Sequence, residues 1–219
     1  MNIKPILFNT EMVRAILSGK KTQTRRIIKP QPTNPRWNNI GWIGWDDGHG
    51  YRMRAPCEVG DILYVRETWS THYDGIHDAL QFCYKADGVD LQSECMPGES
   101  NRWYPSIHMP KKAARIFLRV MDVRVEPLQN MREEDAIAEG FIDSPAGCDS
   151  PLERFLVLWN KTIKRDDLRK FGYDANPWVW VISFERCDKP KETDACAKQF
   201  AATMFVPLEN GHGCSTGVE

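Results

Sequence analysis

Residues 178–184 read WVWVISF, an almost uninterrupted run of aromatic, β-branched and other apolar side chains. A run of this length and composition is typical of a β-strand that is buried on both faces. The chain has 219 residues, of which 42% are hydrophobic, and this is enough for one sizeable core around such a strand. We therefore expect one domain built on a sheet that contains this strand in its interior.

Alternating apolar and polar residues predict further strands. The clearest is at residues 114–125 (ARIFLRVMDVRV), and others are predicted at 3–8, 62–68 and 80–84. Pro5 places the first of these at a sheet edge or a strand start, because proline has no N–H for a central ladder.

Three helices are predicted between the strands. Apolar residues recur at helical spacing after Asn9 or Thr10, either of which can cap a helix, and Gly19 is suited to the left-handed conformation that ends one. Residues 131–139 are acidic in the first turn and are followed by a glycine, and residues 152–163 have one apolar face.

Strands interrupted by helices at irregular spacing, without a repeating βα unit, favour a mixed α+β fold over a doubly wound one. We expect a curled sheet that forms a small β-barrel with flanking helices. Residues 1–187 are predicted to form this single domain, with long loop insertions near 30–58, 70–105 and 142–176; the first insertion is a long ordered loop or a short hairpin. Residues 188–219 have the composition of a flexible C-terminal tail.

Charge and cysteine usage exclude several classes of protein. The formal net charge is -1, so a broad basic surface for a long duplex is not expected, and any contact with nucleic acid should be local. Seven cysteines without a C-x-x-C pair and five scattered histidines predict reduced thiols, no bound metal and no cofactor. No apolar run approaches the roughly 20 residues that span a bilayer, so we expect a cytoplasmic protein without membrane contact. The oligomeric state is not indicated.

Residues 19–26 (GKKTQTRR) are the strongest candidate for a functional site. Between Lys20 and Lys29 the chain has five cations and no acid, although it is nearly neutral overall. We expect a small cationic pocket that handles a nucleobase or nucleoside. The alternative is a solvated basic turn and strand. The predicted substrate-binding residues in this segment are Gly19, Lys20, Thr22, Arg25 and Arg26.

Thr24 is the candidate nucleophile and Lys21 the candidate base, because a threonine hydroxyl attacks only when a neighbour takes its proton. Like charges nearby and partial burial would lower the pKa of Lys21 toward a value useful for that role. In an ideal strand these two positions point to opposite faces, so their joint action requires a bend or bulge between them.

Two carboxylates and several tryptophans complete the candidate set. Glu139, at the end of the helix predicted over 131–139, is the candidate general acid; the alternative is an exposed glutamate. Glu67 competes for this role and is assigned to substrate binding, although it can instead pair with an arginine. Trp69 and the loop tryptophans offer aromatic faces for stacking on a base, and the alternative for each is to fill the core.

The pattern G-x-K-x-x-T-x-R at Gly19, Lys21, Thr24 and Arg26 resembles the signature of ASCH domains, which belong to the PUA-like superfold. Other core elements that resemble those of ASCH domains are the G-D-[VIL] strand entry at 59–63, the central strand at 117–128, the helix at 131–139 and the closing strand at 178–184. This resemblance covers about half of the chain and implies a PUA-like small curled β-barrel.

Threonine at position 24, where many ASCH domains have glutamate, is similar to the small bacterial amidohydrolases that remove the acetyl group from N(4)-acetylcytidine. That resemblance implies that Lys21 is the proton acceptor, Thr24 the nucleophile and Glu139 the proton donor. These enzymes have about half the length of this chain, so the long insertions have no counterpart in them. Long ASCH proteins of this layout resemble those encoded by phages and prophages.

Three functions therefore stay open at the level of the sequence. The first is an amidohydrolase that acts on an acylated cytidine or a related modified nucleoside. The second is a noncatalytic module that binds RNA or a modified base through the same cations and aromatic residues. The third is a phage or prophage accessory protein.

Overall fold

The structure is a computed structural model that describes residues 1–32, 34–38, 41–46, 54–74, 79–91, 102–141 and 150–190. Residues Met1–Asp188 form one compact unit, and Lys189–Glu219 are separate from it. The flexible tail expected at 188–219 lies almost entirely outside the described residues and stays a prediction.

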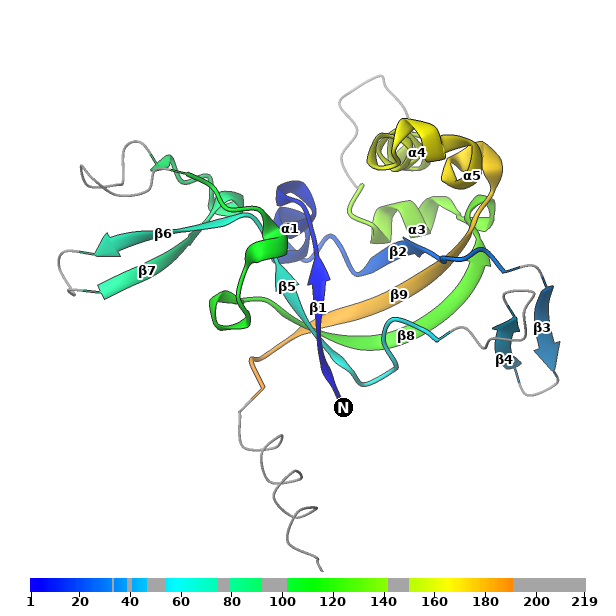
Figure 1. Cartoon of the computed structure of the whole chain (residues 1–219), viewed down its shortest axis with the longest axis horizontal. Helices are drawn as coiled ribbons and strands as arrows, with labels where there is room; N and C mark the ends of the chain where they lie inside the picture. The colour runs from blue at the N-terminus through cyan, green and yellow to red at the C-terminus, as the bar shows by residue number, and fades with distance from the viewer. Residues whose placement is uncertain are drawn as a thin grey trace, which may run out of the picture. The chain divides into compact units, whose positions relative to one another are not determined.

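A five-stranded mixed sheet organises the compact unit (Figure 1). Its strands, in spatial order, are β1 (Ile3–Leu7), β5 (Ile62–Arg66), β8 (Phe117–Pro127), β9 (Trp178–Cys187) and β2 (Gln23–Ile27). β1 and β5 run parallel, and the other neighbours are antiparallel. The sheet confirms, with small shifts of the ends, the strands predicted at 3–8, 62–68, 114–125 and 178–184.

The apolar sequence of β9 is explained by two cores, one on each face of the strand. Trp180, Ile182 and Phe184 belong to the first core, together with residues of α1, β1, β5 and β8. Val179 and Val181 point the other way, into a second core shared with helical residues. The prediction that this strand is buried on both faces is therefore confirmed.

The sheet is curled, but the described residues contain no pairing between its edge strands β1 and β2. Phe8 N donates to Arg66 O, so the alternate residues Pro5 and Leu7 direct their backbone groups to the open edge, where Pro5 offers no N–H. Arg26 Nη2 donates instead to Leu7 O at 2.7 Å. The expected α+β fold with a curled sheet is confirmed. In a closed barrel β1 and β2 would pair through their backbones, whereas here the side chain of Arg26 connects them.

Helix α1 (Thr10–Leu17) connects β1 to β2 and packs on the first core. The side chain of Asn9 accepts a hydrogen bond from the first turn, as an N-cap residue does, and Val13 and Ile16 are buried. Gly19 follows the helix with φ 74°, the left-handed conformation predicted for it.

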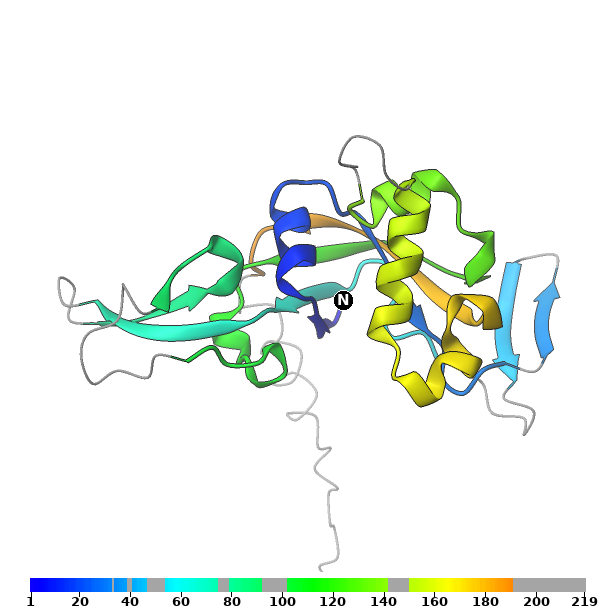
Figure 2. The same cartoon turned by 90° about the horizontal axis from the view of Figure 1, so that it is seen from above.

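Two helices contribute to the second core, α3 (Glu133–Ala138) and α4 (Pro151–Thr162). A third, α5 (Leu168–Phe171), lies beside α4, where Trp159 Nε1 donates to Phe171 O at 2.9 Å. The three helices lie over β2 and the adjoining ends of β8 and β9 (Figures 1 and 2). Helix α4 begins with a capping box, in which Ser150 Oγ accepts from Glu153 N and Ser150 N donates to the Glu153 carboxylate. The helices predicted at 131–139 and 152–163 are confirmed in shortened or shifted form.

Two hairpins extend from the sheet. Strands β3 (Asn34–Asn38) and β4 (Gly41–Asp46) form a hairpin in the first predicted insertion, which agrees with one of its two expected forms. Strands β6 (Trp69–Asp74) and β7 (Ala79–Tyr84) form the second (Figure 2). The sequence predicts β7 but not β6, whose residues WSTHYD lack an apolar alternation.

Candidate functional site

The predicted basic segment lies in the turn that leads from α1 into β2. The N–H groups of Lys20 and Lys21 both donate to Ala15 O, at 2.8 and 3.0 Å, and hold the chain against the end of the helix. Thr22 N donates to Ala138 O at 2.8 Å and ties the turn to the end of α3. Lys21 therefore precedes the strand, and the bend required between positions 21 and 24 lies at this turn.

Lys21 and Glu139 meet in a buried ion pair. Lys21 Nζ donates to Glu139 Oε2 at 2.5 Å, to Glu139 O at 3.0 Å and to Gln23 O at 2.8 Å. These three bonds use all three N–H groups of an ammonium. The two side chains are 0% and 3% exposed. Two candidate catalytic residues, 118 positions apart in the sequence, are thus brought into direct contact.

The environment of this pair lowers the pKa of Lys21. Burial lowers the pKa of Lys21, and the neighbouring charges of Arg26 and Arg25 act in the same direction, while Glu139 opposes the change. A lowered pKa reduces the free-energy difference between the ion pair and its tautomer, in which Glu139 holds the proton and Lys21 is a free amine. The direction of the shift agrees with the one predicted for a lysine base.

Arg25 is the centre of a second group of charges, on the face of β2 that meets the helices. Its Nη2 lies 2.7 Å from Glu126 and 3.4 Å from Asp135, and its Nη1 lies 3.5 Å from Glu139. Arg124 contacts the first two of these acids as well. Three carboxylates therefore balance the charge of Arg25, so this residue adds no free positive charge to the cationic pocket expected from the sequence.

Thr24 and Arg26 lie on the opposite face of β2. Thr24 is buried and pairs with Ile182 of β9, so it faces the first core. The ring of Phe8 lies 5.6 Å from Lys21 Nζ and 5.2 Å from Arg26 Cζ. Phe8 is therefore a common neighbour of the lysine and the arginine on the face to which Thr24 belongs. Burial lowers the pKa of Arg26, and the charge of Glu139 opposes this change.

A pocket of about 670 Å³ lies between α1 and α4 and reaches the candidate site at Glu139. Its lining includes Lys20 and Gly140 and the apolar side chains of Met12 and Leu158. The volume is in the range of small-molecule sites. Of the predicted substrate-binding residues, Lys20 is thus next to a cavity that borders the proposed acid.

Gly140 is a site residue that the sequence analysis used only as a helix end. Its φ is 104°, and a Cβ there would lie 3.0 Å from Ala15 Cβ and 3.4 Å from Lys21 Cβ. Glycine is therefore required for α3 to approach the turn closely enough for Glu139 to reach Lys21.

Glu67 belongs to a different cluster. Its carboxylate is bound by Arg115 in a two-bond ion pair at 3.0 and 3.1 Å, and Arg115 also binds Asp87 and lies over the ring of Tyr84. Burial raises the pKa of Glu67, and Arg115 opposes this change. Glu67 thus pairs with an arginine, which was the alternative expected for this residue. The assignment of Glu67 to substrate binding stays a prediction.

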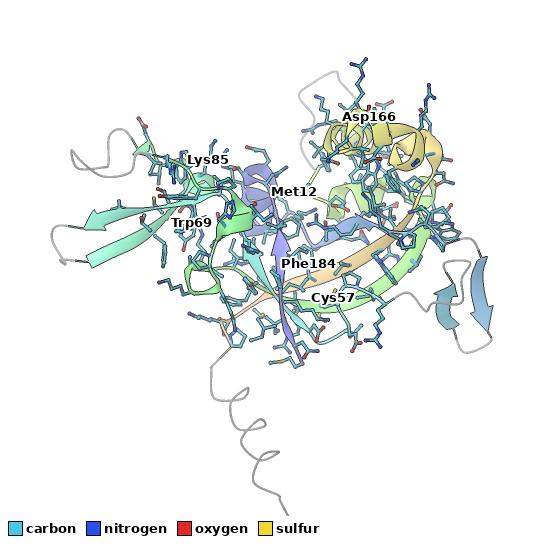
Figure 3. All side chains as sticks on the ribbon, viewed as in Figure 1. Met12, Cys57, Trp69, Lys85, Asp166 and Phe184 are labelled. Carbon is cyan, nitrogen blue, oxygen red and sulfur yellow. The ribbon has the colours of Figure 1, made fainter. Side chains whose placement is uncertain are left out.

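Trp69 lies with Glu67 rather than with Lys21. Its ring contacts Phe82 and Tyr104, with centroids 5.8 and 5.2 Å apart. Figure 3 shows it at the base of the β6–β7 hairpin, in the same part of the molecule as Lys85. The short helical turn Lys85–Asp87, which follows this hairpin, is linked to α1 by Arg14 Nε, which donates to Ala86 O at 2.8 Å.

The acids around Arg25 are functional candidates that sequence reasoning missed. Arg124 and Glu126 stand two positions apart on β8, so they share one face of a strand whose other residues are largely apolar. That charged face was the available signal. Asp135 gave no comparable signal, because acids in the first turn of a helix are ordinary.

The described residues hold no group of three or more histidine, cysteine, aspartate or glutamate side chains arranged for a metal ion. Within the same residues, no helix has the length and apolar character needed to cross a membrane.

No protein-family model matches the sequence, and no curated protein matches it. Two solved structures are similar to this chain. One is an ASCH domain from Lactobacillus crispatus, with 11% identity and a TM-score of 0.41, covering 84% of this chain and 79% of that one. The other is a protein of the DUF984 family from Enterococcus faecalis, with 11% identity and a TM-score of 0.41, covering 86% and 81%.

Proposed function

We propose that this protein is an amidohydrolase that acts on an acylated cytidine or a related modified nucleoside. The observation that carries the proposal is the buried contact between Lys21 and Glu139, at 2.5 Å, beside a strand that bears Thr24. A lysine and a glutamate that share a proton out of water are suited to supply a base and an acid together.

The reaction begins with the neutral tautomer of this pair. Lys21, as a free amine, takes the proton of the Thr24 hydroxyl while the oxygen attacks the acyl carbonyl. Glu139, as the carboxylic acid, gives its proton to the exocyclic nitrogen of the base, which leaves as the free amine of cytidine. The proton that Lys21 took then passes to the Glu139 carboxylate across their contact, which restores the free amine and the carboxylic acid. Water attacks the threonine ester while Lys21 takes its proton, Glu139 protonates the departing threonine oxygen, and the carboxylic acid is released.

The proposal is tested by incubating the purified protein with N(4)-acetylcytidine and measuring the release of cytidine and acetate. Thr24→Val keeps the shape of the side chain but removes the hydroxyl, and it should lower turnover by about 10³-fold or more. Lys21→Met and Glu139→Gln should each do the same. Thr71→Val, at a half-buried position of β6 that has no predicted role in the site, is the matched control and should retain full turnover. Absence of turnover by the unmutated protein contradicts the proposal.

A noncatalytic binding module is the second candidate function. The buried ion pairs of Lys21 and Arg25 with Glu139, Glu126 and Asp135 also serve to hold β2 against α3, a structural role that requires no reaction. Because these charges are already matched, RNA would be bound by exposed cations elsewhere. A module of this kind would bind labelled RNA with an affinity that falls as salt concentration rises, without releasing any product.

A further inference from the structure

A second pocket, of about 410 Å³, lies between the end of β2 and the helices α4 and α5. It is separate from the cavity that borders Glu139. We propose that this pocket binds a phosphate group.

The charge of the pocket lining is the first observation. Four cations line the pocket with a single acid, Asp167; acids outside the lining neutralise Arg25, but the other three cations still outnumber Asp167. The chain as a whole has a net charge of only -1, so this is a strong local excess. In the part of the chain that the structure describes, Lys29 and Lys164 have no carboxylate partner within ion-pair distance, and both are exposed. Such a concentration of cations attracts an anion. The cations of the lining are Arg25, Arg26, Lys29 and Lys164.

An unused donor in the lining is the second, independent observation. The side chain of Arg25 is 0% exposed, and its Nη atoms bind acids on the β8 and α3 side. Its Nε–H is buried, and none of the described residues accepts a hydrogen bond from it. A buried donor without an acceptor costs free energy, so an anion that approached it from the pocket would be stabilised. Phosphate is such an anion.

The lining also fixes one of the exposed cations. Lys29 Nζ lies 4.5 Å from the ring centroid of Phe171, a cation–π contact that holds the ammonium beside α5. Lys29 and Phe171 both line the pocket. A lysine held in this way loses less freedom when it binds an anion than a lysine that moves freely in solvent.

The consequence for the substrate rests on the proposed function. Arg25 lines this pocket, and its Nη1 lies 3.5 Å from Glu139. One ligand could therefore place its phosphate in this pocket and its acylated nucleobase at Glu139. The substrate would then be a nucleotide or an RNA rather than a free nucleoside.

Binding of phosphate is measured by titration calorimetry, with inorganic phosphate, cytidine and cytidine 5′-monophosphate as probes. We expect inorganic phosphate to bind and the monophosphate to bind more tightly than cytidine. A short RNA with and without a 5′-phosphate separates the two sources of the group: preference for the phosphorylated end indicates a terminal phosphate, and equal affinity indicates internal ones. If neither phosphate nor the monophosphate binds, the proposal is overturned.

Two pairs of variants locate the site. The double substitution Lys29→Ala/Lys164→Ala should weaken phosphate binding roughly tenfold. The control removes the same charge elsewhere, by Lys111→Ala/Lys112→Ala at two exposed positions of another segment, and should have much less effect. Equal weakening by both pairs would show nonspecific attraction and overturn the pocket assignment.

A single substitution should have the opposite effect. Asp167→Asn removes the one acid of the lining and should tighten phosphate binding severalfold. Asp166→Asn changes the same charge at the neighbouring position, which lies outside the lining near α5 (Figure 3), and should change affinity less. An equal effect of the two would again contradict the assignment. These experiments measure binding, so they test the phosphate site independently of the proposed hydrolysis. Thr24→Val should abolish turnover and leave phosphate binding unchanged.

Discussion

At the scale of single residues, the contact between Lys21 and Glu139 has a cost as well as a chemical use. Removing one partner of a buried ion pair destabilises a protein much more than replacing both partners with apolar residues. Three hydrogen bonds hold the ammonium, and two of them go to Glu139. The contribution of this pair to stability can therefore be measured separately from its proposed role in catalysis.

We expect Glu139→Gln to lower the free energy of unfolding by about 3–5 kcal/mol, since it leaves the Lys21 ammonium buried without a counter-charge. The double variant Lys21→Met/Glu139→Leu should be less destabilised than either single variant. Urea denaturation measures both. Arg119 and Glu185, an exposed pair at 4.0 Å, provide the control, and their removal should cost less than about 1 kcal/mol. Simple addition of the two single effects in the double variant would contradict the expectation.

Gly140 gives a second prediction at this scale. Gly140→Ala places a Cβ 3.0 Å from Ala15 Cβ at a backbone φ of 104°, so it should destabilise the fold by about 1–3 kcal/mol and move α3 away from Lys21. Gly88 also has a positive φ, of 80°, but open space around it. Gly88→Ala therefore reports backbone strain alone. Thermal unfolding of the two variants should show the larger loss for Gly140, and equal losses would mean that the steric contact has no effect.

At the scale of the elements, Asp61 fixes how β1 begins beside β5. It accepts hydrogen bonds from Asn2 N at 2.8 Å and Glu58 N at 3.1 Å and an ion pair from Lys4 at 2.9 Å. Burial by itself would raise the pKa of Asp61, but these partners outweigh it and hold the pKa below the ordinary value of 3.8. The carboxylate is thus stabilised in the folded state.

This lowered pKa predicts the direction of an acid effect. Because the folded state releases the proton of Asp61 more easily than the unfolded state, the stabilisation is present above about pH 4 and is lost as the pH falls through the folded-state pKa. Asp61→Asn should lower the free energy of unfolding at pH 7 by about 1–3 kcal/mol, and the difference from the unmutated protein should shrink toward pH 2. Urea denaturation across this range measures it. Asp174→Asn, at an exposed position, should show neither effect.

Most of the helices and strands were predictable, because the signals for them lie within short stretches of sequence. Periodicity placed the four long strands, and the capping residue Asn9 and the terminal Gly19 placed α1. Strand β6 was missed because it is held by its six pairs with β7 rather than by an apolar face of its own. The open edge between β1 and β2 also depends on contacts far apart in sequence, such as that of Arg26 with Leu7.

The site was predictable only in part. Lys21, Thr24 and Glu139 followed from the chemistry of the basic segment and from its resemblance to a known signature. That Arg25 would be neutralised could not be predicted, since its partners Glu126 and Asp135 lie about a hundred residues away on β8 and α3. Local sequence gives the charge of a segment, but the balance of charge at a site depends on which elements meet there.

At the scale of the whole molecule, the compact unit Met1–Asp188 contains the complete five-stranded sheet and all the candidate residues. A chain that ends at Asp188 should therefore fold and should unfold at the same temperature as the full chain, to within a few degrees. Differential scanning calorimetry of the two chains measures this. A large loss of thermal stability would show that residues 189–219 contribute to the folded unit, against the predicted flexible tail.

The position of β9 has a further consequence for how the protein is made. Among the described strands, β2 has β9 as its partner, and β9 ends at Cys187. While the ribosome is still synthesising the first three quarters of the chain, the segment with Lys21 and Thr24 has no strand to pair with. The nascent chain must therefore carry these residues unpaired until β9 emerges, so β2 is among the first strands to be synthesised and the last to be paired in this sheet.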